Sequence, residues 1–156
     1  MNNHSYQHIL VVEDDEDIRR ICAKILTDSG YQVATAEDGK AAWKMLQAAG
    51  HDPGGFDLLI TDNQMPYLSG VELVRRMRAV DMHLPVIMAS GNTPDNDSSL
   101  HLAAILPKPY MPAQLLQAVG EVLHWSTVMV NSRGEHLSRA ADGNAAVPGG
   151  NAQLAI

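Results

Sequence analysis

The stretch HILVVEDDED, residues 8–17, changes from apolar to acidic near its middle. Its first part, residues 8–13, is rich in β-branched side chains and has the length of a strand. Apolar residues at helical spacing begin at Ile18 and end before Gly30, a residue type that often terminates helices. The stretch therefore predicts a buried strand whose end carries carboxylates and leads directly into a helix.

The same unit of strand and helix recurs along the chain. The expected strands cover residues 8–13, 31–36, 56–62, 85–90 and 103–107. The expected helices cover residues 18–29, 39–49, 71–80, 94–103 and 111–125. Regular alternation of this kind predicts an α/β fold in which helices cover both faces of a parallel sheet. The first and third strands are the most uniformly apolar, so we expect them to be central.

The composition indicates an ordinary globular protein and excludes several classes of function. Of the 156 residues, 46% are hydrophobic and 19% are charged, and 11 basic against 18 acidic residues give a formal net charge of −7. This acidic balance argues against direct binding of nucleic acid, which needs clustered lysine and arginine. The sequence has no apolar run that could span a membrane and no signal-peptide pattern, and its one cysteine, Cys22, excludes an internal disulfide. We therefore expect a cytoplasmic protein without membrane insertion.

The organisation along the chain indicates one folded domain. We expect a polar N-terminal arm over residues 1–6, the domain over residues 7–125 and a disordered tail over residues 126–156. The tail is rich in alanine, glycine and asparagine and has no sustained apolar periodicity, so it offers little surface to bury.

Polar side chains stand at the ends of four of the expected strands. They are Glu13 and Asp14 at the first strand, Asp62 at the third, Ser90 at the fourth and Lys108 after the fifth. Ligands of open parallel sheets bind beyond the carboxyl ends of the strands, so we expect these side chains to share one pocket. Carboxylates this close repel each other unless a cation lies between them, and hard oxygen ligands suit Mg²⁺. The sequence therefore predicts a magnesium site beside a lysine and a hydroxyl group.

This set of groups suits phosphoryl transfer, a reaction that proteins catalyse mainly by positioning and by neutralising charge. A carboxylate can itself be the nucleophile and form an aspartyl-phosphate. The sequence contains neither the GxxxxGK[ST] loop nor the GxGxxG fingerprint of nucleotide-binding proteins. We therefore expect the phosphoryl group to come from a donor protein or a small phosphodonor.

Four motifs, in this order and at this spacing, resemble the receiver domain of two-component response regulators. They are VVEDDEDIRR (11–20), FDLLITDNQMP (56–66), IMASG (87–91) and LPKPY (106–110). Each motif alone is weak, but the combination is specific, and the resemblance covers about residues 8–125. It implies the flavodoxin-like (βα)5 receiver fold, a doubly wound sheet of five parallel strands in the order 2-1-3-4-5.

The resemblance assigns a phosphoacceptor and a metal site. Asp62 matches the aspartate that accepts the phosphoryl group. Asp14 matches the residue that binds Mg²⁺ directly, and Glu13 matches the residue that holds it through water. Gln64 matches the position whose backbone carbonyl is a further ligand. The implied cofactor is therefore Mg²⁺, bound by Glu13, Asp14, Asp62 and the Gln64 carbonyl.

The resemblance also implies how the phosphoryl group is held and sensed. Ser90 matches the hydroxyl residue that hydrogen-bonds this group, and Lys108 matches the lysine that pairs with it, before a proline whose peptide bond is commonly cis. Ile105 replaces the family's aromatic switch residue, three positions before the lysine, and Gly91 stands where alanine is common. An aliphatic side chain cannot report the movement of Ser90 as an aromatic ring does, so the transmission of the signal stays open.

The implied function is that of a stand-alone response regulator in a two-component phosphorelay. Asp62 would accept a phosphoryl group from the phosphohistidine of a sensor histidine kinase or a histidine phosphotransfer protein. Since no DNA-binding domain follows the receiver, the output would be altered contact with a target protein through the face formed by 94–103, 103–107 and 111–125. A phosphorylation-dependent dimer fits the same scheme. The chain would not be an enzyme, beyond catalysing its own phosphorylation and slow dephosphorylation.

Three alternatives stay open. The chain could be a pseudo-receiver that switches by partner binding without phosphorylation, or an intermediate carrier of phosphate in a relay. A phosphatase of the haloacid dehalogenase type also uses a strand-end aspartate and Mg²⁺. Its Asp-x-Asp motif is absent, however, because Asn63 and Gln64 follow Asp62.

Overall fold

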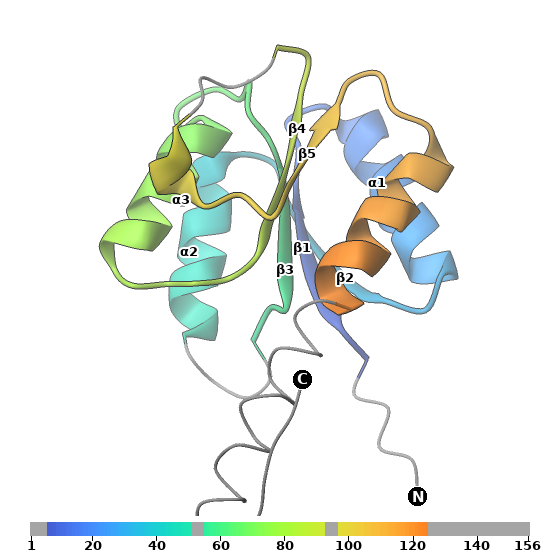
Figure 1. Cartoon of the computed structure of the whole chain (residues 1–156), viewed down its shortest axis with the longest axis horizontal. Helices are drawn as coiled ribbons and strands as arrows, with labels where there is room; N and C mark the ends of the chain where they lie inside the picture. Colours follow the sequence, from blue (N-terminus) through green and yellow to red (C-terminus); the bar gives the residue numbers. More distant parts are fainter. Residues whose placement is uncertain (1–5, 51–54, 93–96, 125–156) are drawn as a thin grey trace, which may run out of the picture. The chain divides into compact units, whose positions relative to one another are not determined.

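The computed structural model describes residues 6–50, 55–92 and 97–124, which form an α/β unit (Figure 1). Five parallel strands make up its sheet, in the order β2-β1-β3-β4-β5. They are β1 (His8–Val12), β2 (Gln32–Ala36), β3 (Leu58–Asp62), β4 (Val86–Ser90) and β5 (Ala104–Pro107). The predicted fold and strand order are confirmed. The predicted tail and most of the predicted arm lie outside the described residues.

Helices cover both faces of this sheet. They are α1 (Glu16–Asp28), α2 (Gly39–Ala49), α3 (Gly70–Ala79), the 3-10 helix η1 (Ser98–Leu100) and a helix over 112–124. The helix over 112–124 is the last among the described residues and is called the last helix below. In Figure 1, α2, α3 and η1 lie on one side of the sheet, and α1 and the last helix lie on the other. Within the described residues, none of the helices has the length and apolar character needed to cross a membrane.

The central strands send alternate side chains into two apolar cores. In β1, Leu10 and Val12 pack with α2 and α3, while Ile9 and Val11 pack with α1 and the last helix. Every residue of β3 and β4 is buried, whereas the edge strand β2 is partly exposed. The expectation that the first and third strands are central is correct, because β3 lies in the middle of the sheet with β1 beside it.

The acidic run after β1 divides between the start of α1 and the edge of the sheet. The carboxylate of Asp15 accepts hydrogen bonds from the backbone N–H groups of Asp17 and Ile18, both at 3.0 Å, and so caps α1. The next two acidic residues lie in the first helical turn, where negative charge interacts favourably with the helix dipole. Glu13 and Asp14 are left at the carboxyl end of β1.

The segment between β4 and β5 differs from the helix expected over 94–103. Among its described residues, 97–103, the helical part is the single 3-10 turn η1. The carboxylate of Asp97 caps this turn through the N–H of Ser99 at 3.0 Å, and His101 ends it in a left-handed conformation with φ of 47°. The prediction of an α-helix is therefore wrong for 97–103, because short polar side chains satisfy the backbone locally instead.

Arginines of α3 hold this segment against the rest of the fold. Arg75 forms an ion pair with Asp97, with 2.9 Å between Nη2 and Oδ2. The guanidinium group of Arg78 donates hydrogen bonds of 2.7 to 3.3 Å to the backbone carbonyls of Met82, Leu84, Leu100 and His101. One side chain thus joins α3 to the loops that precede β4 and β5.

Asp97 provides a test of this arrangement at low pH. The hydrogen bond from the Ser99 hydroxyl group and the contact with Arg75 lower the pKa of Asp97 from 3.8 to about 2. Because this pKa is lower in the folded than in the unfolded chain, these contacts stabilise the fold above pH 3.8, and the stabilisation is lost as the pH falls toward 2. We expect an NMR titration to show the low pKa in the wild type, a clear rise in Ser99→Ala and a smaller rise in Arg75→Ala. An ordinary pKa for Asp97 in the wild type would contradict this.

Gly70 lies against the backbone at the end of β3. A Cβ atom at position 70 would overlap the carbonyl oxygen of Asp62, whereas a Cβ atom at Gly91 would meet no described atom within 4 Å. We expect Gly70→Ala to lower the free energy of unfolding by about 2 kcal/mol, as overpacking does, and Gly91→Ala to leave it nearly unchanged. Urea unfolding measures both variants, and equal effects would contradict the packing described.

Candidate functional site

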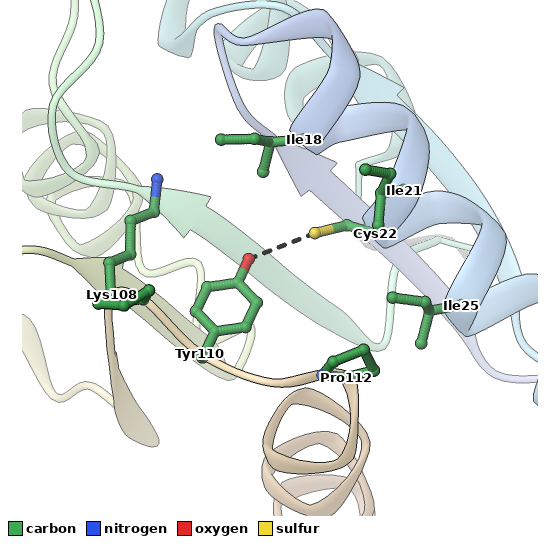
Figure 2. Close-up of a pocket in the computed structure, with 8 residues that line it drawn as sticks. Ile18, Ile21, Cys22, Ile25, Lys108, Tyr110 and Pro112 are labelled. Carbon is green, nitrogen blue, oxygen red and sulfur yellow. Dashed lines mark hydrogen bonds between the residues drawn. The ribbon is translucent and has the colours of Figure 1, made fainter.

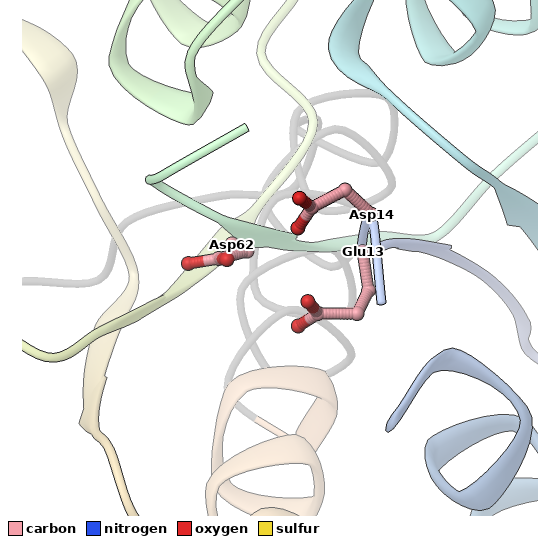
Figure 3. A group of neighbouring side chains, drawn as sticks. All are labelled: Glu13, Asp14 and Asp62. Atoms are coloured by element: carbon pink, nitrogen blue, oxygen red, sulfur yellow. The ribbon is translucent and has the colours of Figure 1, made fainter. Parts of the chain in front are cut away.

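The carboxyl ends of β1 and β3 bring three carboxylates together. The two strands are neighbours, with Val12 opposite Thr61. Glu13 and Asp14 therefore follow β1 at the level where Asp62 ends β3. One oxygen from each of the three carboxylates lies within 4.8 Å of the others, and Figure 3 shows the side chains around a common space. Glu13 and Asp62 are buried and Asp14 is exposed, so the carboxylates that the sequence predicted for one pocket do lie together.

A lysine faces these carboxylates from the end of β5. Nζ of Lys108 lies 3.0 Å from Oε2 of Glu13 and 3.2 Å from Oδ2 of Asp62. The backbone N–H of Lys108 donates to the carbonyl of Ser90 at 2.9 Å, and the peptide bond to Pro109 is cis, as the resemblance implied. The expected contact between Lys108 and Asp62 is present, and Glu13 shares the same ammonium group.

Burial and the neighbouring charges have opposite effects on the pKa values of Glu13 and Lys108. Burial raises the pKa of Glu13, and the hydrogen bond and charge of Lys108 offset this only in part. Burial alone would lower the pKa of Lys108, but its contacts with Glu13 and Asp62 outweigh burial, and the pKa is raised. One ammonium group cannot neutralise three carboxylates, so the pocket keeps an excess of negative charge.

The donor atoms fit a hard divalent cation. Carboxylate oxygens are the ligands that Mg²⁺ prefers, and the excess negative charge favours a cation among them. The backbone N–H of Gln64 donates to Oδ1 of Asp62 at 3.2 Å, so the backbone of Gln64 stays beside the carboxylates. Glu13, Asp14 and Asp62 could therefore hold Mg²⁺, while the role of the Gln64 carbonyl stays a prediction.

Ser90 lies on the strand beside the one that carries Asp62, and its hydroxyl group hydrogen-bonds within its own turn. Ser90 ends β4, where its neighbour Ala89 lies opposite Asp62. Its Oγ donates to the carbonyl oxygen of Asn92 and accepts from the backbone N–H of Asn92 at 3.3 Å. The contact with a phosphoryl group that the resemblance implies for Ser90 stays a prediction, and it requires the hydroxyl group to leave Asn92.

Arg19 is a positioning residue that sequence reasoning missed. From the first turns of α1, its Nη1 donates to the backbone carbonyl of Glu13 at 2.6 Å and approaches that of Asp14 at 3.4 Å. These contacts fix the backbone that carries both carboxylates. A cation placed in the helix that follows a strand-end acidic pair is the signal that could have indicated it.

Ile105 lies on the edge strand β5, at the position where the family's aromatic residue is expected. Its neighbours Ala104 and Leu106 pack into the core shared with the last helix. Since side chains alternate along a strand, Ile105 points to the opposite face of the sheet, where it is 43% exposed. This face of β5 is therefore open to contact with another molecule.

An apolar pocket adjoins the charged site, between α1 and the start of the last helix (Figure 2). Its volume is about 410 Å³, and its lining includes Ile18, Ile21 and Ile25 of α1 together with Lys108 and Pro112. Sγ of Cys22 lies 3.3 Å from the hydroxyl oxygen of Tyr110 at its base, and burial raises the pKa of both groups. Cys22 is thus a buried packing residue with one polar contact.

Comparison with known proteins identifies the family. The model of the response regulator receiver domain matches residues 9–120. The response regulator receiver protein CpdR of Brucella abortus is 34% identical over 122 residues, which cover 75% of this chain and 97% of CpdR. The response regulator SaeR of Staphylococcus epidermidis is 32% identical over 120 residues, which cover 74% of this chain. The match covers only about half of the length of SaeR, 50%.

Solved structures show the same arrangement of strands and helices. The chemotaxis protein CheY4 of Vibrio cholerae has a TM-score of 0.67 at 30% identity, over 76% of this chain and 99% of CheY4. The response regulator TrrA of Thermotoga maritima, solved in complex with Mg²⁺-BeF, has a TM-score of 0.65 at 27% identity, over 74% and 98% of the two chains. The chain belongs to the response regulator receiver domain family.

Magnesium provides a test of the carboxylate site. A ligand that binds only the folded chain raises its stability by mass action, by about 2.7 kcal/mol at a hundredfold excess over Kd. We expect MgCl₂ to raise the melting temperature of the wild type, and Asp14→Asn to lose most of this gain. Asp17→Asn removes another exposed acidic residue, outside the site, and should keep the gain. Calorimetry with and without MgCl₂ measures all three proteins, and an equal response would contradict the assignment.

Proposed function

We propose that this chain is a response regulator that accepts a phosphoryl group on Asp62 from the phosphohistidine of a protein donor. The observation that carries the proposal is a buried strand-end carboxylate with an ammonium group at 3.2 Å and two more carboxylates within 4.8 Å. A carboxylate in such a place can act as a nucleophile while its surroundings neutralise the incoming charge. The donor would be a sensor histidine kinase or a histidine phosphotransfer protein.

In the proposed transfer, a carboxylate oxygen of Asp62 attacks phosphorus, and an O–P bond forms as the N–P bond of the donor breaks. The electron pair of the N–P bond returns to the imidazole ring, which takes up a proton from solvent. Lys108 neutralises charge first on the acceptor and then on the bound phosphoryl group. Ser90 would exchange the carbonyl of Asn92 for a phosphoryl oxygen, because its hydroxyl group already lies at the end of β4.

We propose that Glu13, Asp14, Asp62 and the Gln64 carbonyl hold Mg²⁺ during this transfer. When bound, the cation supplies neutralisation of the charge on the transferred group. Glu13 has a second task in the pocket, since it also pairs with Lys108 at 3.0 Å and so keeps the ammonium group in place.

Phosphorylation would shift an equilibrium between two conformations and alter contacts with a target protein. We propose that the contacts involve β5, with its exposed Ile105, and the last helix; over 97–103 the expected face holds η1 rather than an α-helix.

The match over 97% of CpdR supports a stand-alone regulator. The same proposal places the chain in the cytoplasm, without direct binding of nucleic acid, and limits its catalysis to its own phosphorylation and slow dephosphorylation.

Incubation with acetyl phosphate and MgCl₂, followed by intact mass, tests the phosphoacceptor. We expect the wild type to gain the mass of one phosphoryl group and Asp62→Asn to gain none, because the amide oxygen is a poor nucleophile. Asp57→Asn is the matched control, since Asp57 precedes the same strand and accepts a hydrogen bond from the backbone N–H of His8 at 2.7 Å. It should be labelled as the wild type is. An unlabelled wild type, or an adduct that survives Asp62→Asn, would refute the proposal.

A further inference from the structure

Tyr67 lies in the loop that connects the end of β3 to α3. Its backbone is left-handed, with φ of 65°, and its side chain is 88% exposed. This conformation is uncommon for residues other than glycine, asparagine and aspartate, because the Cβ atom crowds the neighbouring carbonyl oxygen. A tyrosine therefore occupies a position whose backbone suits a smaller residue better.

The loop imposes this conformation, and the ring does not. Pro66 fixes the backbone before Tyr67, and the N–H of Leu68 donates to the carbonyl of Pro66 at 2.8 Å. Leu68 is buried in the core with α2, and its carbonyl oxygen lies so close to Gly39 that a Cβ atom there would overlap it. Both sides of the turn are thus fixed by the fold, while the ring of Tyr67 is left outside.

The ring of Tyr67 contributes little to the fold itself. At 88% exposure it buries almost no apolar surface, and it forms no ring pair with another described residue. A residue in an uncommon conformation at a functional site indicates a role that outweighs the strain. Aromatic side chains, moreover, carry a large share of the binding energy at protein interfaces.

We propose that Tyr67 is a docking residue for the protein that donates the phosphoryl group. The proposal rests on the transfer to Asp62 proposed above. Tyr67 stands five positions after Asp62, on the loop that leaves the same strand end. Because the loop starts at the strand end that carries Asp62, a domain that brings a phosphohistidine to Asp62 would contact residues around this strand end, whereas a small phosphodonor would not. The loop after β1 and the first turn of α1 carry the exposed acidic residues 14–17, so charge attracts a basic donor surface there, and Tyr67 adds an uncharged contact.

The variant Tyr67→Asn tests the proposal, because asparagine fits a left-handed backbone and removes the ring. Tyr6→Asn is the matched control, since Tyr6 is 65% exposed and precedes β1, at the opposite end of the parallel sheet from Asp62. Two phosphodonors are compared on the full chain with MgCl₂. One is acetyl phosphate, and the other is the purified histidine kinase that labels the wild type fastest in a phosphotransfer profile.

With the kinase, we expect kcat/KM of Tyr67→Asn to fall about tenfold, mainly through KM, as for the loss of an interface aromatic residue. With acetyl phosphate, the rate should stay within about twofold of the wild type, and the melting temperature should be unchanged or raised. Tyr6→Asn should match the wild type with both donors.

Unchanged transfer from the kinase, or an equal loss with acetyl phosphate, would overturn the proposal. A change in self-association, measured by sedimentation, with normal transfer would assign the ring to a contact between two copies and would overturn it as well. A wild type that acetyl phosphate does not label would instead refute the phosphorylation of Asp62, which is a different result from a loss confined to the protein donor.

Discussion

The ammonium group of Lys108 joins the ends of three strands, and the rest of the site depends on it. It reaches from the end of β5 to Glu13 after β1 and to Asp62 on β3. Carboxylates as buried as these are costly unless they are paired, and like charges in one pocket add to that cost. The parallel sheet brings these carboxylates together, because its strand order places the carboxyl ends of β1 and β3 side by side. The lysine offsets part of this charge, and the part that is left favours a cation among the carboxylates.

Much of the fold could be predicted from the sequence, because its signals are local and repeated. The apolar run of β1 is followed by an acidic residue and that of β3 ends in one, which indicates both the position of the strands and the end of the sheet that carries the carboxylates. The division of the acidic run was also readable: Asp15 caps α1, as short acidic side chains do at helix starts, and leaves Glu13 and Asp14 to the pocket. Strand order came from the family resemblance, since alternation alone indicates a parallel sheet but not which strands are neighbours.

The parts that sequence reasoning missed depend on contacts between side chains and distant backbone. The segment 97–103 reads as a weak helix, yet the hydrogen bonds of Asp97 with Ser99 and the guanidinium of Arg78 hold it as a turn. Neither contact has a periodic signature. Arg19 was missed for a related reason. Its place in the helix after the acidic pair was visible, but a carbonyl acceptor exists at every position, so the sequence does not name the partner of the guanidinium group. The pairing of Glu13 with Lys108 was also missed, because it joins residues that are 95 positions apart and depends on the folded geometry.

The hydrogen bonds of Ser90 have a consequence for the energy of switching. Its hydroxyl group is already satisfied by the carbonyl of Asn92, two positions along the same turn. A phosphoryl oxygen would therefore compete with an existing acceptor rather than fill an empty place, and the free energy gained is the difference between a charge-assisted and a neutral hydrogen bond. Such a difference is small, so the turn of residues 90–92 would set the resting population of the two conformations as much as the phosphoryl group itself. The backbone conformation of residues 90–92, which supplies this acceptor, then becomes a means of setting the threshold of the response.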